Sequence, residues 1–439
     1  MKIGIVSLGC AKNLVDSEIA LGILSKEGHT IVSDPSRAEI IIVNTCGFIE
    51  AAKEESIGAI LEMAQYKEKG RCRGLIVMGC LSQRYAQELW TELPEIDALL
   101  GVNELDSLNE VIAGLGRHER AIRRSDNLFD YDRVFPRLLS AGPHLAYLKI
   151  AEGCSHACAF CVIPKIRGRY RSRSPRVLME EAGQLAAAGV QELTVIAQDT
   201  TAYGRAAGTS IVELLGDLAK LDIPWIRLLY THPAFISTEL LELIAATPNV
   251  VKYVDLPLQH VSAPVLQAMK RPGNMDSFGR LVEKIRTLIP GVVIRSSFIV
   301  GFPGETEEHF DQLLGFLEQQ RLDHVGIFQY SREENSAAYN LPKQVPQRVK
   351  KERYRRAMDV QRRISLELNE VLLGKQLPVL LESYSEESDL VLIGRHRGQA
   401  PDVDGVVYLG RNDQRPGKIV TARIIEAHPY DLVGEVVEV

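Results

Sequence analysis

Short apolar runs alternate with helical stretches over residues 1–330, and this alternation limits the possible folds of the chain more than any other feature. The runs at 40–43 (Ile-Ile-Ile-Val) and 75–78 (Leu-Ile-Val-Met) are typical of strands that are buried on both faces of a sheet. Strands that take turns with helices indicate βαβ units and a parallel sheet. We therefore expect an α/β protein, and 439 residues correspond to about three domains.

The first block of this alternation, residues 1–116, predicts an N-terminal parallel α/β domain. Its expected strands are 3–8, 39–44 and 74–78, and its expected helices are 13–27, 50–67 and 83–93. Residues 117–140 lose the alternation and contain six arginines, so we expect a linker there.

The second block, residues 141–372, predicts six βα repeats, which suit an open (βα)6 partial barrel of the TIM type. The expected strands are 146–150, 192–197, 225–230, 251–255, 292–299 and 324–329, with helices at 177–188, 210–219, 236–246, 276–288 and 305–319. A basic connecting helix is expected at 345–373. The tail, 374–439, predicts a small all-β barrel with strands at 377–381, 390–393, 405–409 and 419–425.

Composition narrows the class of protein further. Apolar residues make up 46% of the chain and charged residues 25%, which excludes disordered and fibrous proteins. The first residues lack the apolar core of a secretory signal and no apolar run approaches 18 residues, so we expect a cytoplasmic protein without a membrane partner. Seven cysteines in a reducing compartment indicate metal or redox chemistry rather than disulfides.

Three of these cysteines, Cys154, Cys158 and Cys161, lie within eight residues, directly after the first strand of the second block. Three thiolates can bind one metal centre, but they cannot fill all four corners of an iron–sulfur cube. One iron would therefore stay open to an exogenous ligand. The alternative is a zinc site that His156 completes.

Three other cysteines, Cys10, Cys46 and Cys80, each lie just beyond the carboxyl end of an expected strand of the first block. The carboxyl ends of parallel strands line the crevice where ligands bind, so these thiols are expected to converge and form a second three-thiolate site. The alternative is that they are ordinary buried cysteines. Cys72 belongs to neither set.

The pattern Cys-x3-Cys-x2-Cys after the first strand of a βα-repeat block, with Phe160 before the last cysteine, resembles the radical S-adenosylmethionine enzymes. The upstream cysteines and the β-barrel tail narrow this resemblance to the methylthiotransferases, over essentially the whole chain. It implies a cluster-bearing N-terminal domain, a radical S-adenosylmethionine domain and a TRAM domain.

The resemblance also implies two 4Fe-4S clusters and the cofactor S-adenosylmethionine. Cys154, Cys158 and Cys161 would hold the cluster whose open iron chelates S-adenosylmethionine, and one electron from it would generate a 5′-deoxyadenosyl radical. Cys10, Cys46 and Cys80 would hold the cluster that carries the sulfur to be inserted. Each cycle would consume two molecules of S-adenosylmethionine, and a reducing electron donor is required.

Further motifs follow other strands of the second block. Gln198, Asp199 and Thr200 resemble the family's segment near the methionine end of the cofactor, and a plain loop is the alternative. Gly301 and Pro303 allow close backbone approach to an adenine, and a strand-to-helix turn is the alternative. Six cations between 165 and 176 form either a solvated face or a site for a carboxylate.

Two features distinguish the branches of this family. The stretch 255–262 contains Gln259 and His260, which resembles the branch that modifies an aspartate of small-subunit ribosomal protein S twelve, so we expect these residues to contact the substrate. The alternative for His260 is a histidine at the barrel rim. Seven basic against eleven acidic residues give 374–439 a net charge of −4, which favours a basic protein partner over nucleic acid as the modified substrate.

The sequence thus predicts an enzyme that inserts a methylthio group at the β-carbon of that aspartate. One alternative is a transfer RNA adenosine methylthiotransferase. A second alternative, from another class, is a non-catalytic iron–sulfur sensor or scaffold.

Overall fold

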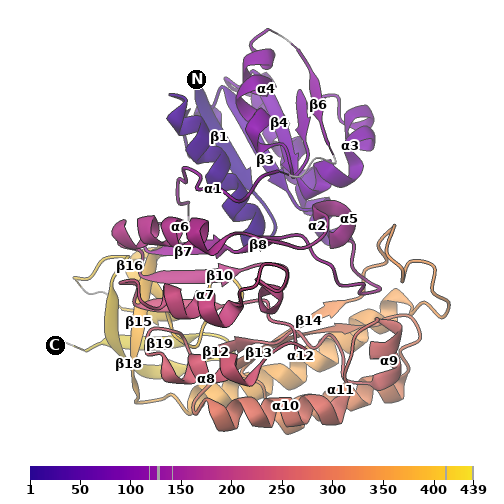
Figure 1. Ribbon diagram of the computed structural model, residues 1–439, viewed down its shortest axis with the longest axis vertical. Helices are drawn as coiled ribbons and strands as arrows, with labels where there is room; N and C mark the ends of the chain where they lie inside the picture. The colour runs from indigo at the N-terminus through magenta and orange to yellow at the C-terminus, as the bar shows by residue number, and fades with distance from the viewer. Residues whose placement is uncertain (118, 126–128, 141, 411–412, 438–439) are drawn as a thin grey trace. The chain divides into compact units, whose positions relative to one another are not determined.

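The computed structural model describes residues 1–117, 119–125, 129–140, 142–410 and 413–437 (Figure 1). They divide into two compact units. The first unit comprises Met1–Ser140, Lys149–Glu181 and Ser331–Tyr339, and the second comprises the described residues of 141–148, 182–330 and 340–439.

A six-stranded parallel sheet is the centre of the first unit, with strand order β2-β1-β3-β4-β5-β6. The strands are β1 (Lys2–Ser7), β2 (Thr30–Ile31), β3 (Ile40–Thr45), β4 (Gly74–Gly79), β5 (Ala98–Leu100) and β6 (Ala121–Arg123). Strands β3 and β4 are buried along their whole length, as their continuous apolar runs predicted. The order places β1 and β3 side by side with β2 outside them, so the chain reverses its direction of winding between these two strands.

Helices connect the strands of this sheet. They are α1 (Ala11–Lys26), α2 (Glu50–Lys69), α3 (Cys80–Glu92) and α4 (Leu108–Leu115), with α5 (Ile163–Arg167) and α6 (Pro175–Ala187) further along the chain. Apolar residues of α2 and α3, such as Ile60, Met63 and Leu89, pack on one face of β3 and β4 in a single core.

Residues 117–140, the expected linker, contain an element of this sheet. Strand β6 pairs in parallel with β5, aligning Ala121 with Ala98. Three aromatic side chains of this segment, Phe129, Tyr131 and Phe135, are buried and their rings pack together. The ring centroids of Phe129 and Tyr131 are 4.6 Å apart. The described part of this segment is therefore more structured than a linker, although the domain boundaries themselves remain predictions.

A short segment from far along the sequence completes the first unit. This strap, Ser331–Tyr339, follows the last strand of the second block. Glu333 of the strap is 1% exposed and pairs with Arg84 at 2.9 Å and with Lys53 at 3.4 Å. Ala338 donates its backbone N–H to the carbonyl of Ala159, between Cys158 and Cys161, at 2.8 Å.

The second unit contains the βα repeats. Its strands are β7 (Leu145–Lys149), β10 (Glu192–Ile196), β11 (Trp225–Leu228), β12 (Tyr253–Asp255), β13 (Val293–Val300) and β14 (His324–Gln329), in two three-stranded sheets of order β11-β10-β7 and β12-β13-β14. A parallel bridge between Ile226 and Val250 links the two sheets. The six strands thus follow the expected order of an open, partial barrel.

Helices separate these strands, and the helices expected for the repeats are present. The helix expected at 177–188 is α6, and the others are α7 (Ile211–Leu218), α8 (Thr238–Ala246), α10 (Met275–Leu288) and α11 (Glu307–Gln320). The short helix α9 (Ala263–Ala268) is absent from the sequence prediction. The connecting helix α12 (Gln347–Glu370) follows, shorter by a few residues than the predicted 345–373.

The tail folds as a closed barrel in the order β15-β16-β17-β19-β18. Its strands are β15 (Gln376–Ser385), β16 (Ser388–His396), β17 (Val407–Leu409), β18 (Ile419–Ala427) and β19 (Leu432–Val436). The fifth strand, β19, is absent from the sequence prediction. The closed barrel with an apolar interior, which includes Val379, Leu409 and Ile424, confirms the predicted all-β tail.

Buried charges hold the barrel against strand β10 within the second unit. Glu192 is fully buried and accepts from Arg227 at 2.6 Å and from Arg395 of β16 at 2.8 Å. Arg395 is 1% exposed and also binds Glu382. Removing one partner would leave the others buried without their counter-charge.

We therefore expect Arg395→Met to lower the stability of the second unit by about 3–5 kcal/mol. Arg423→Met, at an exposed barrel arginine, is the control and is expected to change stability by less than about 0.5 kcal/mol. Thermal melting and limited proteolysis of the tail measure both. Equal melting temperatures for the two variants would contradict the role of Arg395.

None of the helices among the described residues is both long and apolar enough to cross a lipid bilayer.

Candidate functional site

The first set of thiols lies at the carboxyl edge of the six-stranded sheet. Cys10 follows β1, Cys46 directly follows β3, and Cys80 directly follows β4. Strands β1 and β3 flank the point where the winding reverses, and such a point opens a crevice at the carboxyl ends of the strands. The predicted convergence of three sequence-distant cysteines therefore has a topological basis.

The backbone around these cysteines approaches closely. Gly9 has a φ of +91°, and a Cβ there would lie 2.8 Å from Cβ of Cys46 and 3.3 Å from its Sγ. Gly79 has a φ of +101°, and a Cβ there would lie 2.3 Å from the side-chain oxygen of Asn44. Glycine at these two positions lets the ends of β1 and β4 bring their cysteines toward Cys46.

Two of the three thiols also lie at helix N-termini. Cys10 is the N-cap of α1, with no side-chain cap hydrogen bond, and Cys80 is the first residue of α3. The N-terminus of a helix presents unpaired N–H groups and partial positive charge, both of which favour thiolates.

Neighbouring charges give the three thiols different acidities. The surrounding protein atoms raise the pKa of Cys10, although part of its surface is exposed, but the charges of Lys12 and Arg167 and the backbone N–H groups of Asn13 and Lys12 leave that pKa below its usual value. Burial raises the pKa of Cys46, and it raises the pKa of Cys80 to about 12. The negative charge of Cys10 also raises the pKa of Cys46, and the charges of Cys46 and Cys10 raise that of Cys80. A bound metal centre favours the deprotonated form of its cysteine ligands.

The second set of thiols lies on the loop between β8 (Ala151–Glu152) and α5. Gly153 has a φ of +79°, and a Cβ there would meet the carbonyl oxygen of Arg169 at 2.4 Å. Backbone hydrogen bonds join Cys154 to Gly168 at 3.1 Å and Cys161 to Cys158 at 3.1 Å. The N–H groups of His156 and Ile163 lie 3.5 Å from Sγ of Cys154 and of Cys161. Backbone hydrogen bonds therefore close this loop, and two of its N–H groups point toward cysteine sulfur atoms.

The two sets are neighbours within the first unit. Val162, the residue after Cys161, packs with Ile166, Val102 and Phe48 against Cys80. The segment directly after the second set thus packs in one apolar cluster with a cysteine of the first set.

Cysteine thiolates, which both donor sets supply, are the usual ligands of iron–sulfur clusters. Among the described residues, no three Cys, His, Asp or Glu side chains meet around one point as ligands of a single ion do. Thiolates on tetrahedral zinc lie only about 2.3 Å from the metal, whereas a cube spaces its ligands more widely. All seven cysteines are outside disulfides.

Cys72 lies apart from both sets. It is 6% exposed, packs in the core beside α2, and its thiol donates to the carbonyl of Gly74 at 3.3 Å. These contacts are those of a structural cysteine, which agrees with its exclusion from both predicted sites.

Two members of the cation run, Arg167 and Arg173, are only 2% and 4% exposed, and they pair with the chain's own carboxylates rather than facing solvent. Sequence reasoning did not identify their partners, Asp16, Glu152 and Glu181. One signal was present: Asn13 and Asp16 follow Cys10 at spacings that place them on one face of α1.

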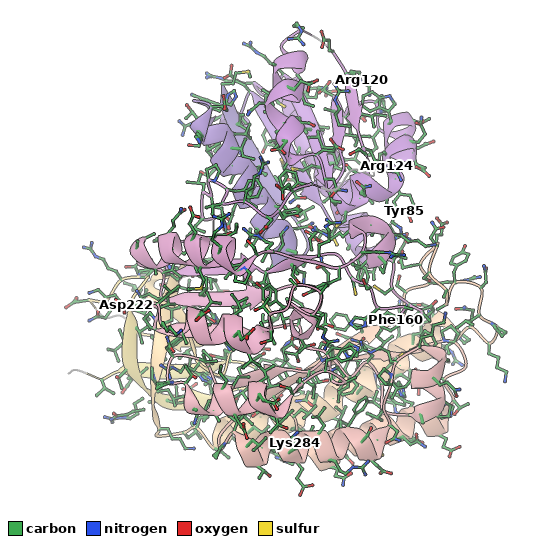
Figure 2. The ribbon with its side chains drawn as sticks, in the orientation of Figure 1. Tyr85, Arg120, Arg124, Phe160, Asp222 and Lys284 are labelled. Atoms are coloured by element: carbon green, nitrogen blue, oxygen red, sulfur yellow. The ribbon has the colours of Figure 1, made fainter. Side chains whose placement is uncertain are left out.

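The predicted cofactor residues lie on both units. Phe160 is on the cysteine loop of the first unit, where Figure 2 labels it. Gln198, Asp199 and Thr200 follow β10 in the second unit, where Asp199 is buried and accepts from Thr201 at 2.5 Å and Thr200 donates to Leu229 at 2.8 Å.

Gly301 and Pro303 follow β13 at the carboxyl edge of the second unit. Gly301 has a φ of +76°, and a Cβ there would lie 2.4 Å from Cγ of Lys350. Glu305 accepts from the N–H groups of Gly301 at 2.6 Å and Phe302 at 3.2 Å. Thr306 caps α11, as the turn alternative expected, so packing alone already explains part of this motif.

Gln259 and His260, the predicted substrate residues, lie after β12. Gln259 has a φ of +70° and its backbone binds β13 at Ser297 and Ile299. His260 is fully buried, its Nδ1 accepts from the N–H of Ser262 at 3.0 Å, and its Nε2 lies 3.8 Å from Glu305. The side chain of His260 thus has no exposed surface, and its contact with a substrate stays a prediction.

Burial lowers the pKa of His260 to about 3, with smaller contributions from the charges of His309 and Arg353. As the pH falls from about 6.5 toward 3, the unfolded chain therefore takes up a proton that the folded chain excludes, and stability is lost. Between pH 6.5 and pH 5 we expect the free energy of unfolding of His260→Asn to fall less steeply than that of the parent. The difference in slope is up to about 1.4 kcal/mol per pH unit. His428→Asn, at an exposed histidine, is the control. If the stabilities of the parent and of His260→Asn, measured by thermal melting, fell equally with decreasing pH, the result would contradict this expectation.

Family matches cover the three parts of the chain. Residues 2–101 match the family described as Uncharacterized protein family UPF0004, residues 148–317 match the Radical SAM superfamily, and residues 373–437 match the TRAM domain.

Curated relatives match nearly the full length. "Ribosomal protein uS12 methylthiotransferase RimO" of Geotalea uraniireducens is 49% identical over 99% of this chain and 98% of the relative. The protein of the same name from Myxococcus xanthus is 47% identical over 99% of this chain and 91% of the relative. The chain belongs to the RimO methylthiotransferase family.

Solved structures agree with the fold. The radical S-adenosylmethionine methyltransferase TsrM of Kitasatospora setae has a TM-score of 0.57 at 15% identity, covering 75% of this chain and 71% of that chain. The cobalamin-dependent S-adenosylmethionine radical enzyme OxsB has a TM-score of 0.54 at 13% identity, covering 77% of this chain and 54% of that chain. At these identities the likeness concerns the fold alone.

Membership in the RimO family confirms several expectations. The α/β class with a C-terminal barrel, the enzyme class of methylthiotransferase, and the cofactors S-adenosylmethionine and 4Fe-4S clusters are those predicted from the sequence. The roles of individual residues remain predictions.

Proposed function

We propose that this chain, like the relatives named for uS12, inserts a methylthio group at the β-carbon of an aspartate in that ribosomal protein. The observation that carries the proposal is that the segment directly after the second thiol set packs in one apolar cluster with Cys80 of the first set. Val162 and Ile166, which follow Cys161, pack against Cys80. A carbon radical made at one site and a sulfur held at the other must meet, so the two sites have to be neighbours.

Cys154, Cys158 and Cys161 are proposed to hold one 4Fe-4S cluster, and Cys10, Cys46 and Cys80 the other. When bound, the clusters and S-adenosylmethionine supply the radical and the sulfur. Three thiolates per cluster leave one iron of each open, which is the position needed for an exogenous ligand.

The chain's own residues protect and orient these groups. Cys80 and Cys154 are 5% and 8% exposed, which limits the access of water and oxygen to these corners. The helix N-termini at Cys10 and Cys80 place partial positive charge beside the thiolates.

Phe160, Gln198, Asp199, Thr200, Gly301 and Pro303 are proposed to contact S-adenosylmethionine. Their positions after β10 and β13, and on the cysteine loop, support this, because the carboxyl ends of parallel strands carry the ligand sites of such barrels. Gln259 and His260 remain proposed as substrate contacts.

The net charge of −4 over 374–439 supports a basic protein as substrate rather than nucleic acid. We also propose that the enzyme acts in the cytoplasm and that an external reductant supplies the electrons. The proposed domain boundaries are 1–116, 141–372 and 374–439.

The test is mass spectrometry of uS12 incubated with reconstituted enzyme, S-adenosylmethionine, sulfide and a reductant. We expect one methylthio addition on the aspartate. Transfer RNA is the parallel substrate, and methylthio-adenosine in place of modified uS12 would overturn the proposal.

A further inference from the structure

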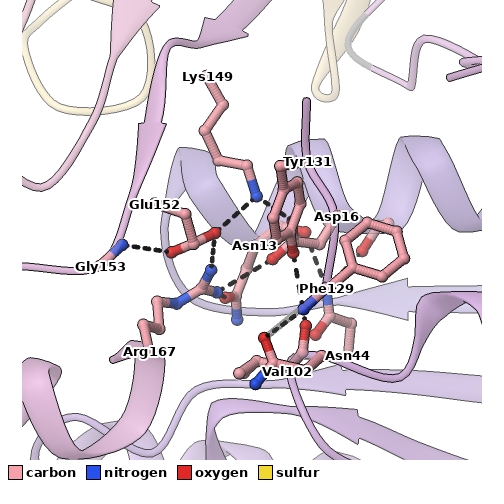
Figure 3. A network of polar contacts seen from close by, with 12 residues as sticks. Asn13, Asp16, Asn44, Val102, Phe129, Tyr131, Lys149, Glu152, Gly153 and Arg167 are labelled. Carbon is pink, nitrogen blue, oxygen red and sulfur yellow. Dashed lines mark hydrogen bonds and ion pairs between the residues drawn. The ribbon is translucent and has the colours of Figure 1, made fainter. Parts of the chain in front are cut away.

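Four charged side chains meet in the interior of the first unit (Figure 3). Arg167 contacts Glu152 at 2.9 Å and Asp16 at 3.1 Å, and Lys149 contacts Asp16 at 2.5 Å and Glu152 at 2.8 Å. Each is 4% exposed or less, and their charges sum to zero. We call these four residues the charge square.

The charge square joins the segments that carry the two thiol sets. Asp16 lies on α1, six residues after Cys10, and Arg167 ends α5, six residues after Cys161. Tyr131 closes one side by donating to Asp16 at 3.2 Å, with the ammonium of Lys149 3.7 Å from its ring centroid. Burying four charges is costly, and stability alone does not require it, because apolar residues of similar volume are often as stable.

Asn13 connects the charge square to a cysteine of the first set. Its Oδ1 accepts from Arg167 at 2.6 Å and from the thiol of Cys80 at 3.7 Å. Its Nδ2 donates to the carbonyls of Leu8 at 3.1 Å and Thr45 at 2.9 Å, at the ends of β1 and β3. Asn13 is therefore fixed in place, and it holds the guanidinium of Arg167 within hydrogen-bonding and electrostatic reach of the sulfur of Cys80.

A fixed positive charge at this place has an electrostatic consequence. The surroundings are buried and of low dielectric, so the charge acts strongly on a neighbouring sulfur. Reduction adds an electron to a cluster, and a nearby cation stabilises the reduced form. Net charge and hydrogen bonds to sulfur are among the factors that set cluster potentials.

We propose that Arg167, held by Asn13 and the charge square, is a positioning residue that raises the reduction potential of the cluster on Cys10, Cys46 and Cys80. This proposal rests on the proposed function, because it requires a cluster at that site. Glu152 acts in the opposite sense, because its negative charge offsets that of Arg167.

The test is a redox titration, followed by electron paramagnetic resonance, of the reconstituted full chain. Cys154, Cys158 and Cys161 are all replaced by alanine in the background, so that only the cluster of the first set gives a signal. Arg167→Met is expected to reduce the equilibrium constant for one-electron reduction at least tenfold, which is about 59 mV toward negative potential. Arg167→Lys keeps the charge and is expected to shift the potential less.

Glu152→Gln keeps the shape of the side chain and removes its negative charge. It is expected to shift the potential in the positive direction, and general loosening of the fold cannot explain opposite shifts. Arg173→Met is the matched control: Arg173 is also a buried arginine of the same segment, paired with Glu181 at 2.7 Å, but it does not contact Asn13.

The outcomes separate the proposal from the function on which it rests. A background chain without iron at the first set contradicts the proposed function. A cluster whose potential is the same in Arg167→Met, Glu152→Gln and the background overturns only the role of Arg167. Equal shifts in Arg167→Met and Arg173→Met also overturn it, because the effect would then be one of fold. If Arg167→Met does not hold a cluster, the Glu152→Gln variant tests the proposal. A positive shift of its reduction potential supports the role of Arg167, and a negative shift or none overturns it.

Discussion

Replacing Cys158 with Ala is expected to reduce the formation of 5′-deoxyadenosine by at least about 10³-fold, which is about 4 kcal/mol of lost transition-state stabilisation. The residue lies between Cys154 and Cys161 on the closed loop, and its loss leaves two thiolates for that cluster. The measurement is chromatography of 5′-deoxyadenosine after incubation with dithionite and S-adenosylmethionine.

His156→Ala is the matched control for this loop. It removes the fourth ligand that the zinc alternative requires and leaves all three thiolates, so we expect cleavage of S-adenosylmethionine within about threefold of the parent. Cleavage that survives in Cys158→Ala would contradict the assignment of the cluster. A parent enzyme that binds clusters and never cleaves S-adenosylmethionine would favour the alternative of a sensor or scaffold.

Replacing Cys46 with Ala is expected to separate the two half-reactions. Formation of 5′-deoxyadenosine should stay within about threefold of the parent, whereas methylthio-uS12 should fall at least about 10²-fold. Cys46 is the suitable member of its set, because it is only half-buried and its loss disturbs little packing, whereas Cys80 lies in an apolar cluster. The measurements are 5′-deoxyadenosine, modified uS12 and iron per chain, which should halve.

Cys72→Ala is the control for this second experiment. Cys72 is buried and bonded to the backbone of Gly74, so the variant should lose about 1 kcal/mol of stability and keep its iron and both activities. Loss of 5′-deoxyadenosine in Cys46→Ala would mean that the two sets do not act independently. Loss of iron in Cys72→Ala would mean that the thiols are wrongly divided between the sites.

Particular residues show how far sequence patterns lead in this chain. The convergence of Cys10, Cys46 and Cys80 could be predicted because parallel strands bring their carboxyl ends to one edge. Strands β5 and β6 are three residues each, too short for any periodicity to be visible, so part of the sheet was expected to be linker.

Long-range contacts explain what the sequence patterns did not reveal about Arg167 and about the burial of His260. Arg167 belongs to a run of cations that resembles a solvated face, and its partner Asp16 lies 151 residues away in the sequence. His260 stands in a motif that suggests contact with a substrate, but the turn at Gln259 directs the chain along β13 and leaves the imidazole buried. A local sequence pattern indicates where strands end and which side chains lie there. Whether a charged side chain is buried depends on tertiary contacts that the local pattern does not contain.

The strap has a consequence for synthesis of the enzyme on the ribosome. The first unit needs Ser331–Tyr339, so it cannot be complete until 259 residues after Cys80 have been translated. At about 5–20 residues per second, this delay is roughly 13–52 s. During that time the thiols of the first set belong to an unfinished unit, in which Arg84 and Lys53 lack the carboxylate of Glu333. Loading of iron and sulfide is therefore expected to follow release of the whole chain rather than emergence of its N-terminal part.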